Sequence, residues 1–385
     1  MTTGTVHWVD TPRKLAEVGR ELEHADVISV DTEQDSFFSH RTKVCVIQVG
    51  AFGEEWVIDA LALDDFSPLA APFLDERIPT IFHAGENDID LLRKDCGLEV
   101  RGLFDSMSAA AIIGLRKAGL APLIEEFYGV VIEKKYQRSD WRKRPLDQEQ
   151  IEYAALDVRY LPRLREQLLE RLRELGREEE AESDFARIER VNHPAKEFDP
   201  DDYFRLDAAR TLDGVGRRVL RDMFVLREEI ASEEDRAPFR VCPNHALEQI
   251  ARLKPPNLAQ LNRIRGLSDR LKQRQGKKIL ALIRRAEKEG PLPKPKRRPS
   301  GAPGPFQLDR EQKRIYDRLR GWRADRSERR GVEPGRVVPN TMLHQIVLRR
   351  PQSKADLEAV GFEPWRVREY GKELLAVLRG NNQSE

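Results

Sequence analysis

The chain has 385 residues, of which 39% are hydrophobic and 35% charged, and its formal net charge at pH 7 is +1. This length accommodates two or three domains, and no apolar run of about 18 residues is present, which excludes a membrane-spanning function. The N-terminal segment lacks the apolar core of a signal peptide, and the three cysteines form no CxxC pair. We therefore expect a cytoplasmic protein without structural zinc or redox chemistry.

Charge is distributed unevenly along the chain. Residues 1–200 contain 26 Lys and Arg against 40 Asp and Glu, whereas residues 201–385 contain 41 against 26. One half is acidic and the other basic, which favours contact of the basic half with a polyanion such as nucleic acid. The alternative is two domains whose surfaces are solvated differently, but a difference of this size with opposite signs favours nucleic acid.

The acidic half begins with strand-like segments and continues with alternating strands and helices. Runs rich in β-branched and aromatic residues predict an antiparallel meander and one further strand, at 26–33, 43–50, 54–61 and 78–84. Helical patterns follow near 65–75, around Ile89 and Leu92, at 105–115, at 120–129, at 151–160 and, as one charged helix, at 161–190. Strands followed by strand–helix units predict a mixed α/β sheet.

Strand signals end near residue 200, and two later segments resemble each other. The segment "FRVCPNHALEQIARLKPPNLAQL" (239–261) matches "GRVVPNTMLHQIVLRRPQSKADL" (335–357), with ten identical residues 96 positions apart. A repeat of this density predicts two copies of one small helical domain. We expect an α/β domain over 1–200, helical domains over 203–290 and 306–380, and a proline-rich basic linker over 291–305.

Carboxylates stand at distinctive places in the α/β domain. Asp31 and Glu33 lie two apart on one face of a strand, where they repel each other unless solvent or a cation screens them. Asp88 begins the helix after the strand at 78–84, and Tyr153 and Asp157 share one helix face with Cβ atoms about 5–6 Å apart. Oxygen donors without cysteine or paired histidines predict Mg²⁺ or Mn²⁺, and two such ions can clamp a phosphoryl displacement.

Neighbouring residues have plainer interpretations. Asp105 is expected to cap a helix, Asp59 to end a strand, and Trp141 to pack beneath the helix of Tyr153. His83 is expected to be a hydrogen-bonded turn residue. Four basic residues before that helix fit either a nucleic-acid backbone contact or a solvated face: Arg138, Arg142, Lys143 and Arg144.

The helix with Tyr153 begins at a recognisable capping signal and has small side chains beside Tyr153. Asp147 is followed three residues later by Gln150, which predicts a capping box. Ala154 and Ala155 keep the helix surface low, and we expect them to leave room for the end of a substrate.

The four carboxylates and the tyrosine stand in three short motifs, "DTE", "HAGENDIDLL" and "YAALD". These motifs resemble the three exonuclease motifs of the DEDD superfamily, tyrosine subtype. The segment "QRSDWRKRPLDQEQIEYAALDVRYL" (137–161) resembles the ribonuclease D family, and the repeated segments are similar to the helicase-and-RNase-D C-terminal (HRDC) module. The resemblance covers nearly the whole chain. It departs at His83-Ala84-Gly85, where many relatives have His-Asn-Ala.

The resemblance implies a ribonuclease-H-like fold and hydrolysis of RNA from the 3′ end, with release of nucleoside 5′-monophosphates. It implies that Asp31, Glu33, Asp88 and Asp157 hold two Mg²⁺ or Mn²⁺ ions and that Tyr153 orients the attacking water. The expected partner is RNA with a free 3′ end, such as precursor tRNA, bound by a monomer without a membrane partner. A DNA-preferring exonuclease and a nucleic-acid-binding protein with a relict site stay open as alternatives.

Overall fold

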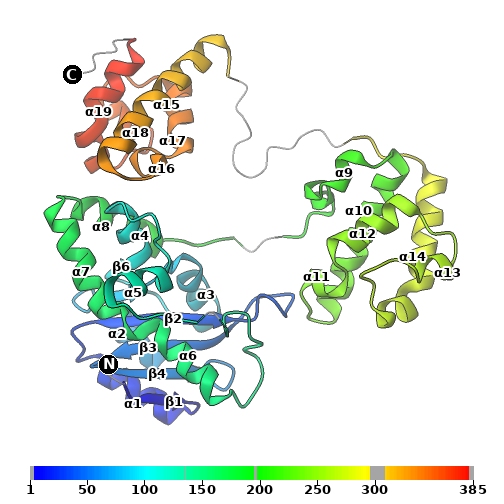
Figure 1. The fold of residues 1–385 in the computed structure, drawn as a ribbon, viewed down its shortest axis with the longest axis horizontal. Coiled ribbons are helices and arrows are strands. Elements are labelled where there is room, and N and C mark those ends of the chain that lie inside the picture. The colour runs from blue at the N-terminus through cyan, green and yellow to red at the C-terminus, as the bar shows by residue number, and fades with distance from the viewer. Residues whose placement is uncertain (1–3, 134, 195–196, 295–307, 381–385) are drawn as a thin grey trace. The chain divides into compact units, whose positions relative to one another are not determined.

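The computed structural model describes residues 4–133, 135–194, 197–294 and 308–380, which fall into two compact units. One unit comprises 1–33, 44–193 and 299–385, and the other comprises 34–43 and 194–298. The unit with residues 1–33, 44–193 and 299–385 contains the sheet and the C-terminal helical domain. The other unit contains the helical domain that precedes it in the chain (Figure 1). The expected linker lies outside the described residues from residue 295 onward. Within the described ranges, no helix is long and apolar enough to span a membrane.

A six-stranded sheet with the order β1-β4-β3-β2-β5-β6 forms the centre of the first unit. Its strands are β1 (Val6–Val9), β2 (Ile28–Gln34), β3 (Val44–Ala51), β4 (Glu54–Asp59), β5 (Thr80–Phe82) and β6 (Leu103–Asp105). β3 and β4 are antiparallel, whereas β1 with β4, β2 with β5 and β5 with β6 are parallel. The predicted mixed sheet is confirmed, and β1 and β6 are strands that the sequence did not indicate.

Eight helices and a short 3-10 turn surround this sheet in the described residues. They are α1 (Pro12–Leu22), η1 (Ser67–Leu69), α2 (Ala70–Leu74), α3 (Glu86–Cys96), α4 (Ser106–Ile112), α5 (Leu120–Tyr128), α6 (Gln148–Arg159), α7 (Leu161–Glu174) and α8 (Glu178–Glu189). All eight residues of β3 are buried, because helices α3 and α6 both pack against this strand. One large apolar cluster joins most helices to the sheet, and a smaller cluster lies beneath α6.

Helices α6 and α4 begin at the caps that the sequence predicted, whereas the helix expected over 161–190 is divided into two. Asp147 and Gln150 form the predicted capping box of α6, and Asp105 caps α4 by accepting from the Ser108 N–H at 2.7 Å. The single helix expected over 161–190 is wrong, since the chain forms α7 and α8 instead. Gly176 lies between them with a φ of 62°, a left-handed conformation that glycine adopts at a helix end without steric cost.

The two helical domains share one arrangement of helices. The first contains η2 (Pro200–Arg205), α9 (Ala208–Thr211), α10 (Gly214–Glu233), α11 (Pro238–Val241), α12 (Asn244–Leu253), α13 (Leu258–Leu261) and α14 (Asp269–Glu289). The second contains α15 (Arg310–Arg330), α16 (Pro334–Val337), α17 (Asn340–Arg349), α18 (Lys354–Ala359) and α19 (Pro364–Leu378). Arg227 donates to Asn244 at 2.7 Å, and Arg323, 96 positions later, donates to Asn340 at 2.8 Å. Corresponding contacts show that α10–α14 and α15–α19 are structural copies, each with its own core.

The second unit also includes the segment 34–43, which begins at the last residue of β2. His40 pairs with Glu228 at 2.7 Å, and the Ala237 N–H donates to the Phe38 carbonyl at 2.9 Å. Arg240 lies 4.0 Å from the centre of the Phe38 ring. This segment is therefore packed against α10 and α11.

Candidate active site

Strand β2 presents the first two expected ligands. Asp31 and Glu33 are half-buried and face the same side of the sheet, because side chains alternate along a strand. Ser29, two residues earlier on that face, donates its hydroxyl to the carbonyl of Val158 at 2.9 Å. A Cβ on Gly50 would lie 2.5 Å from the Ser29 Oγ, so glycine allows this close packing. The end of α6 is thereby held beside the carboxylates of β2.

Helix α3 brings Asp88 to the same place. Asp88 lies in the first turn of α3, and the Thr32 hydroxyl of β2 donates to its carboxylate. Gly85, which precedes the helix, donates its N–H to Asp105 at 2.9 Å. A Cβ on Gly85 would lie 2.5 Å from the Phe82 Cβ, so the tight turn from β5 into α3 requires glycine. Asp105 is thus a structural carboxylate, as predicted.

Helix α6 contributes Tyr153 and Asp157. The Tyr153 ring lies between two aromatic neighbours, with centroids 6.3 Å from Trp141 and 5.8 Å from Tyr136. Trp141 is 1% exposed, which confirms that it packs beneath the helix. These contacts fix the ring and direct where the hydroxyl can reach.

The two alanines of α6 do not have the expected role. Ala154 and Ala155 are fully buried and pack in the cluster beneath α6 with Cys45, Val57 and Trp141. They allow the helix to lie close to the sheet, because a larger side chain would push the two apart. The expectation that they leave room for a substrate end is wrong.

Burial and mutual repulsion raise the pKa of the carboxyl groups. The pKa of Asp31 is raised well above its ordinary value by burial and then by the charges of Asp157, Asp88 and Glu33. Burial, with help from Asp157 and Asp88, raises the pKa of Glu33 to about 9, and burial raises the pKa of Asp157 to about 7. Asp31, Glu33 and Asp157 therefore resist ionisation, and they need a nearby positive charge before all of them can ionise together.

The donor chemistry fits a divalent cation, although no finished cage is present. In the described ranges, no three acidic, histidine or cysteine side chains are gathered closely enough to hold an ion. The charges of Asp157 and Asp88 nevertheless act on both Asp31 and Glu33, so the four carboxylates belong to one electrostatic group. Carboxylate oxygens suit Mg²⁺ or Mn²⁺. The exonuclease superfamily that these motifs resemble depends on divalent metals.

The hydroxyl of Tyr153 remains protonated at neutral pH. Burial, followed by the charges of Asp157, Glu33 and Asp31, raises its pKa above the ordinary value for tyrosine. A phenol in this state donates a hydrogen bond and does not accept a proton as a base. Its chemistry is therefore that of a positioned donor.

Two other expected residues serve the fold. His83 lies with Nδ1 2.9 Å from the Ser106 Oγ, and burial lowers its pKa to about 4, so it is neutral. Asp59 ends β4 and receives two bonds from Arg144, at 2.5 and 2.6 Å. Arg144 also donates to the carbonyl of Cys45 at 3.0 Å, which commits this arginine to the fold. The other three basic residues of the segment have exposed side chains: Arg138, Arg142 and Lys143.

Several residues of the site were not found from the sequence. Thr32 holds Asp88, Ser29 anchors α6, and Tyr136 packs on Tyr153. Ser29 and Thr32 lie within or beside the "DTE" motif, so strand periodicity was a usable signal for Ser29. Tyr136 had no such signal, because its position depends on the loop before α6. A hollow of about 400 Å³ adjoins these rings, lined in part by Val131, Tyr136, Tyr153 and Leu156.

Two family descriptions match the chain. A 3′-5′ exonuclease domain matches residues 6–173, which contain β2, α3 and α6. The HRDC domain matches residues 216–283 and 312–378, which are the two structural copies. The sequence-based resemblance to an exonuclease followed by two such modules is confirmed.

Curated relatives include bacterial and eukaryotic proteins. A ribonuclease D of Gluconacetobacter diazotrophicus is 30% identical over 381 residues, covering 97% of this chain and 92% of that protein. An exosome complex component 10 homolog of Caenorhabditis elegans is 33% identical over 254 residues, covering 64% of this chain and 29% of that protein. The chain spans between 20% and 29% of the length of the Rrp6-like and exosome component 10 relatives in plant, worm and fly.

Solved structures agree with these relatives. The catalytic core of RRP6 from Trypanosoma brucei superposes with a TM-score of 0.70 at 25% identity, covering 75% of this chain and 82% of that one. Escherichia coli RNase D, an exoribonuclease involved in structured RNA processing, superposes with a TM-score of 0.63 at 25% identity, covering 98% and 100%. The expected ribonuclease-H-like exonuclease domain with helical HRDC domains is thereby confirmed. The chain belongs to the ribonuclease D family of 3′→5′ exoribonucleases.

Proposed function

We propose that the protein removes nucleotides from RNA 3′ ends and releases nucleoside 5′-monophosphates in a reaction that requires divalent cations. The observation that carries this proposal is the group of three carboxyls with raised pKa values beside Tyr153, together with Asp88, whose charge helps to raise the pKa of Asp31 and Glu33. They come from β2, α3 and α6, three elements that Ser29 and Thr32 tie together. Ionising all of these acid groups together disfavours the folded state unless a cation binds them.

Each residue of this group has a proposed task. Asp31, Glu33, Asp88 and Asp157 would hold two Mg²⁺ or Mn²⁺ ions. When bound, such ions supply an activated water and neutralise charge on the scissile phosphate. Tyr153 would donate its hydroxyl to orient the attacking water, because the raised pKa keeps its proton in place.

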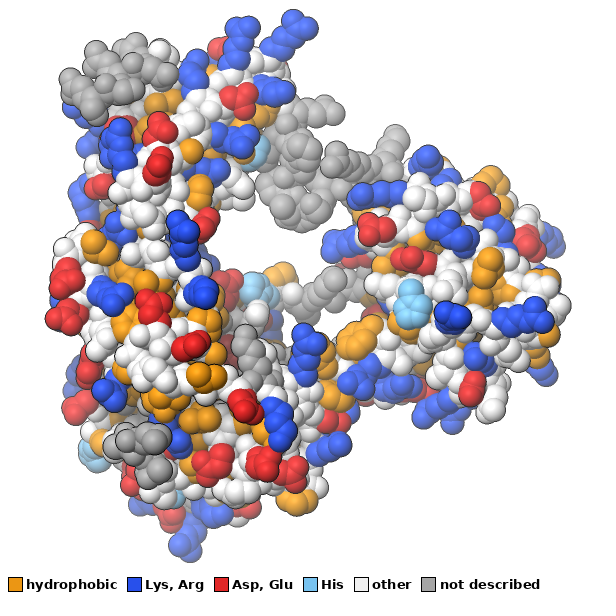
Figure 2. Space-filling model, viewed as in Figure 1, with side chains coloured by type: hydrophobic (Ala, Val, Ile, Leu, Met, Phe, Trp, Pro, Cys, Tyr) orange, Lys and Arg blue, Asp and Glu red, His pale blue; other side chains and the backbone are white. Residues whose placement is uncertain are grey.

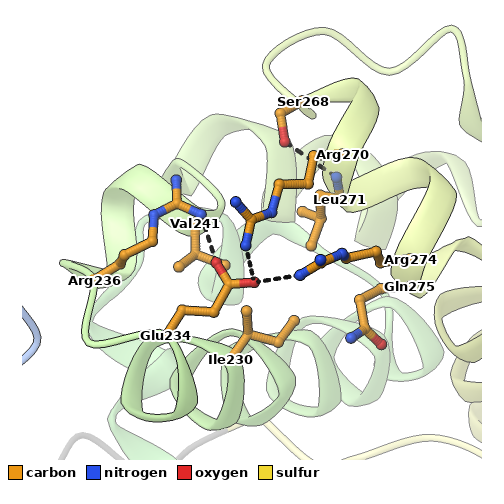
Figure 3. Close-up of a pocket in the computed structure, with 9 residues that line it drawn as sticks. All are labelled: Ile230, Glu234, Arg236, Val241, Ser268, Arg270, Leu271, Arg274 and Gln275. Carbon is orange, nitrogen blue, oxygen red and sulfur yellow. Dashed lines mark hydrogen bonds and ion pairs between the residues drawn. The ribbon is translucent and has the colours of Figure 1, made fainter.

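RNA beyond the scissile bond needs cationic contacts, and the first helical domain offers a suitable cluster. Arg236, Arg270 and Arg274 all donate to Glu234, at 2.8, 2.9 and 3.4 Å (Figure 3). Three cations around one carboxylate leave an excess of positive charge. Lys and Arg side chains are also spread over much of the visible face of this unit (Figure 2). The pocket among them has a volume of only about 20 Å³, so we propose contact with backbone phosphates and not with bases.

Salt dependence tests the cluster. Replacing Arg270 and Arg274 with alanine is expected to weaken RNA binding and to reduce the slope of log K against log salt by about 1 to 2. Lys278→Ala is the matched control. Lys278 lies on α14 with Arg270 and Arg274, but it forms a single pair with Glu229 of α10, at 3.0 Å. An unchanged slope in the double variant, measured by fluorescence anisotropy, would remove this cluster from the RNA path.

The relatives support a proposal for the physiological substrate class. The related enzyme of Escherichia coli acts in structured RNA processing. We propose that this protein likewise trims structured RNA, with the 3′ tails of precursor tRNA as the leading candidate, and that it works as a cytoplasmic monomer. The basic segment of Arg138, Arg142 and Lys143 is proposed to contact the RNA backbone near the site.

The deciding experiment measures nucleotide release from a 3′-tailed RNA with and without EDTA. We expect single nucleoside 5′-monophosphates with Mg²⁺ or Mn²⁺ and no release after chelation. Activity that survives complete chelation would refute the mechanism. A DNA of the same sequence, assayed in parallel, separates a ribonuclease from a DNA-preferring exonuclease, and binding without any hydrolysis would indicate a relict site.

A further inference from the structure

We propose that Arg336 of the second helical domain is a positioning residue for α3, the helix that carries Asp88. The inference rests on the proposed role of Asp88 in holding a cation. Arg336 does not touch the carboxylate group. It acts through a continuous series of polar contacts that ends at the first turn of α3.

The second helical domain is docked on the exonuclease domain through α8. Arg330 pairs with the buried Glu180, and Arg368 pairs with Glu179. Arg177 donates to the carbonyl of Ile112 at 2.6 Å and to the carbonyl of Arg330 at 3.0 Å, which links both domains. The contact is therefore built from several interactions, and Arg336 lies within it.

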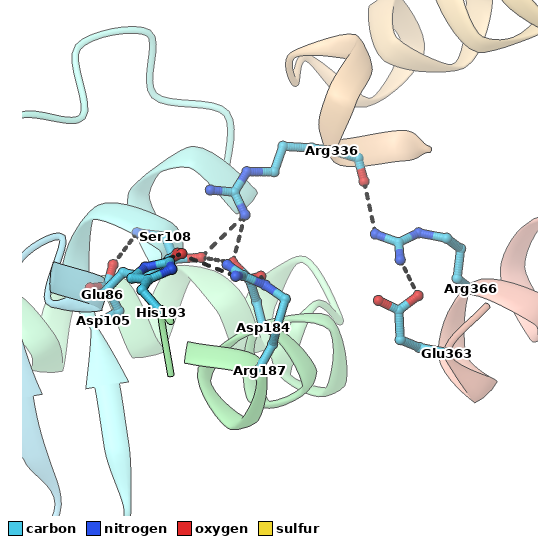
Figure 4. A network of polar contacts seen from close by, with 9 residues as sticks. All are labelled: Glu86, Asp105, Ser108, Asp184, Arg187, His193, Arg336, Glu363 and Arg366. Carbon is cyan, nitrogen blue, oxygen red and sulfur yellow. Dashed lines mark hydrogen bonds and ion pairs between the residues drawn. The ribbon is translucent and has the colours of Figure 1, made fainter. Parts of the chain in front are cut away.

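One branch of the series runs through α8. The Nη1 of Arg336 lies 2.7 Å from a carboxylate oxygen of Asp184 (Figure 4). The other oxygen of Asp184 accepts from Arg187 Nε at 2.9 Å, and Arg187 Nη1 donates to Glu86 at 3.2 Å. Glu86 is the first residue of α3 and stands two residues before Asp88.

A second branch reaches the same helix through α4. The Nη1 of Arg336 also donates to the Ser108 hydroxyl at 3.2 Å. The N–H of Ser108 donates to Asp105 at 2.7 Å, and Asp105 accepts from the N–H of Gly85 at 2.9 Å. Gly85 is the cap of α3, so the two branches converge on adjacent residues at its start.

Both ends of this arrangement are held firmly. On the side of the helical domain, the buried Arg366 donates to the carbonyl of Val337 at 3.0 Å and to that of Arg336 at 3.4 Å. On the other side, burial favours a higher pKa for Asp184, but Ser108, Arg187 and Arg336 hold its pKa below the ordinary value. Asp184 is thus a permanent anion between two arginines, and neither contact depends on a group that titrates near neutral pH.

Comparison of the two copies shows that this docking is specific to the second. The residue equivalent to Arg330 in the first copy is Glu234, and the residue equivalent to Arg368 is Gln273. A glutamate facing the acidic helix α8 would be repelled, so only the second copy carries charges that complement it. Arg336 has an arginine equivalent, Arg240, which donates to the carbonyl of Phe37 at 2.5 Å. In each copy this arginine contacts a residue outside its own domain.

Hydrogen exchange in the metal-free full-length protein tests the proposal independently of catalysis. Arg336→Gln is expected to speed exchange of the first amides of α3 by about 3- to 10-fold. Arg187→Gln, which cuts the first branch inside the exonuclease domain and leaves the docking pairs in place, should produce a similar increase. Arg368→Ala, which removes an exposed pair of the same interface outside both branches, is the matched control and should leave α3 unchanged. Arg336→Lys should restore most of the protection, because a cation remains beside Asp184.

The same variants are then titrated with Mg²⁺ in the nuclease assay. We expect the half-saturating Mg²⁺ concentration to rise by about 3- to 10-fold for Arg336→Gln and Arg187→Gln and to stay unchanged for Arg368→Ala. Unaltered exchange at α3 in Arg187→Gln would overturn the proposal and reduce Arg336 to a docking contact. A wild-type protein without Mg²⁺-dependent activity would instead refute the proposed function, while the exchange result would still decide whether Arg336 positions α3.

Discussion

Tyr153 combines a ring fixed between Trp141 and Tyr136 with a hydroxyl that keeps its proton. Tyr153→Phe preserves the ring contacts and removes only the donor. We expect turnover to fall by about 100-fold, which is typical of losing one positioned hydrogen-bond donor, with little change in Mg²⁺ affinity. Single-turnover rates together with calorimetric Mg²⁺ titration measure the two effects separately.

Tyr136→Phe is the matched control for this prediction. Its hydroxyl donates to Glu149, away from the carboxylates, so turnover should stay within about 3-fold of the wild type. Equal losses in the two variants would show that the aromatic packing matters and that the Tyr153 hydroxyl has no special task.

Ala84 adopts a strained backbone conformation at the turn into α3, with a φ of 60°. A left-handed conformation costs an alanine about 1–2 kcal/mol, whereas glycine adopts it freely. Ala84→Gly is therefore expected to raise the free energy of unfolding by about 0.5–1 kcal/mol, despite the larger entropy of the unfolded glycine chain. Ala111→Gly, inside α4, should instead lower it by about 1 kcal/mol. Urea denaturation measures both, and a destabilised Ala84→Gly variant would contradict the strain.

At the scale of elements, β2 and α6 carry carboxyl groups whose pKa values are higher in the folded protein than in the unfolded chain. The folded protein therefore holds protons that the unfolded chain has released. Glu33 has a pKa of about 9 and Asp157 a pKa of about 7 in the folded protein. Both groups stabilise the metal-free protein at pH values below the pKa that they have in the unfolded chain. That stability is lost as the pH rises through the folded values. We expect the metal-free protein to melt at progressively lower temperature as the pH rises from about 5 to about 9.

A divalent cation should reverse this trend, because it binds the deprotonated carboxylates. Mg²⁺ or Mn²⁺ is expected to raise the melting temperature by at least about 4 °C more at alkaline than at mildly acidic pH. Calorimetry in buffers of different ionisation enthalpy should also detect proton release on binding. Asp31→Asn/Glu33→Gln is the control, and it should lose both the metal effect and most of the pH dependence. A cation effect that is the same at both pH values would contradict a shared metal site.

The elements near the site differ in how far the sequence revealed them. Residues Asp147, Gln150, Tyr153 and Asp157 act within a few positions of one another, so caps and helical spacing were enough to predict α6. β1 and β6 have four and three residues and pair with strands far away in the chain, so local patterns were too short to show them. The contact of Thr32 with Asp88 joins two elements 56 positions apart, which periodicity alone cannot reveal.

At the scale of the whole chain, the opposite charges of its two halves have a second explanation beside nucleic-acid binding. Arg330, Arg336 and Arg368 of the basic half are paired with acidic residues of α8, namely Glu180, Asp184 and Glu179. The sequence showed the residues of α8 only as part of one charged helix, because the partners of its acidic residues lie about 150 or more positions later. Part of the charge asymmetry therefore serves docking within the protein, and the arginines around Glu234 belong to the remainder.

Docking of the second helical domain also depends on one close backbone contact. Gly114 has a φ of 96°, and a Cβ at this position would lie 2.4 Å from the carbonyl oxygen of Gly331. Gly114→Ala therefore combines backbone strain with a steric clash and should destabilise the docked arrangement by about 2 kcal/mol or more. We expect faster hydrogen exchange around Glu180 and Arg330, together with a raised half-saturating Mg²⁺ concentration if Arg336 is displaced as well.

Gly129→Ala separates the two contributions to this effect. Gly129 has a φ of 66° at the end of α5, but no atom lies within 4 Å of the added Cβ. This variant should show the conformational cost alone, about 1 kcal/mol, with unchanged exchange at Arg330. If Gly114→Ala also left that exchange unchanged, the second helical domain would have to be held by its ion pairs without the close backbone approach. In that case, raising the salt concentration should release the domain, because exposed pairs such as Arg368 with Glu179 are screened first.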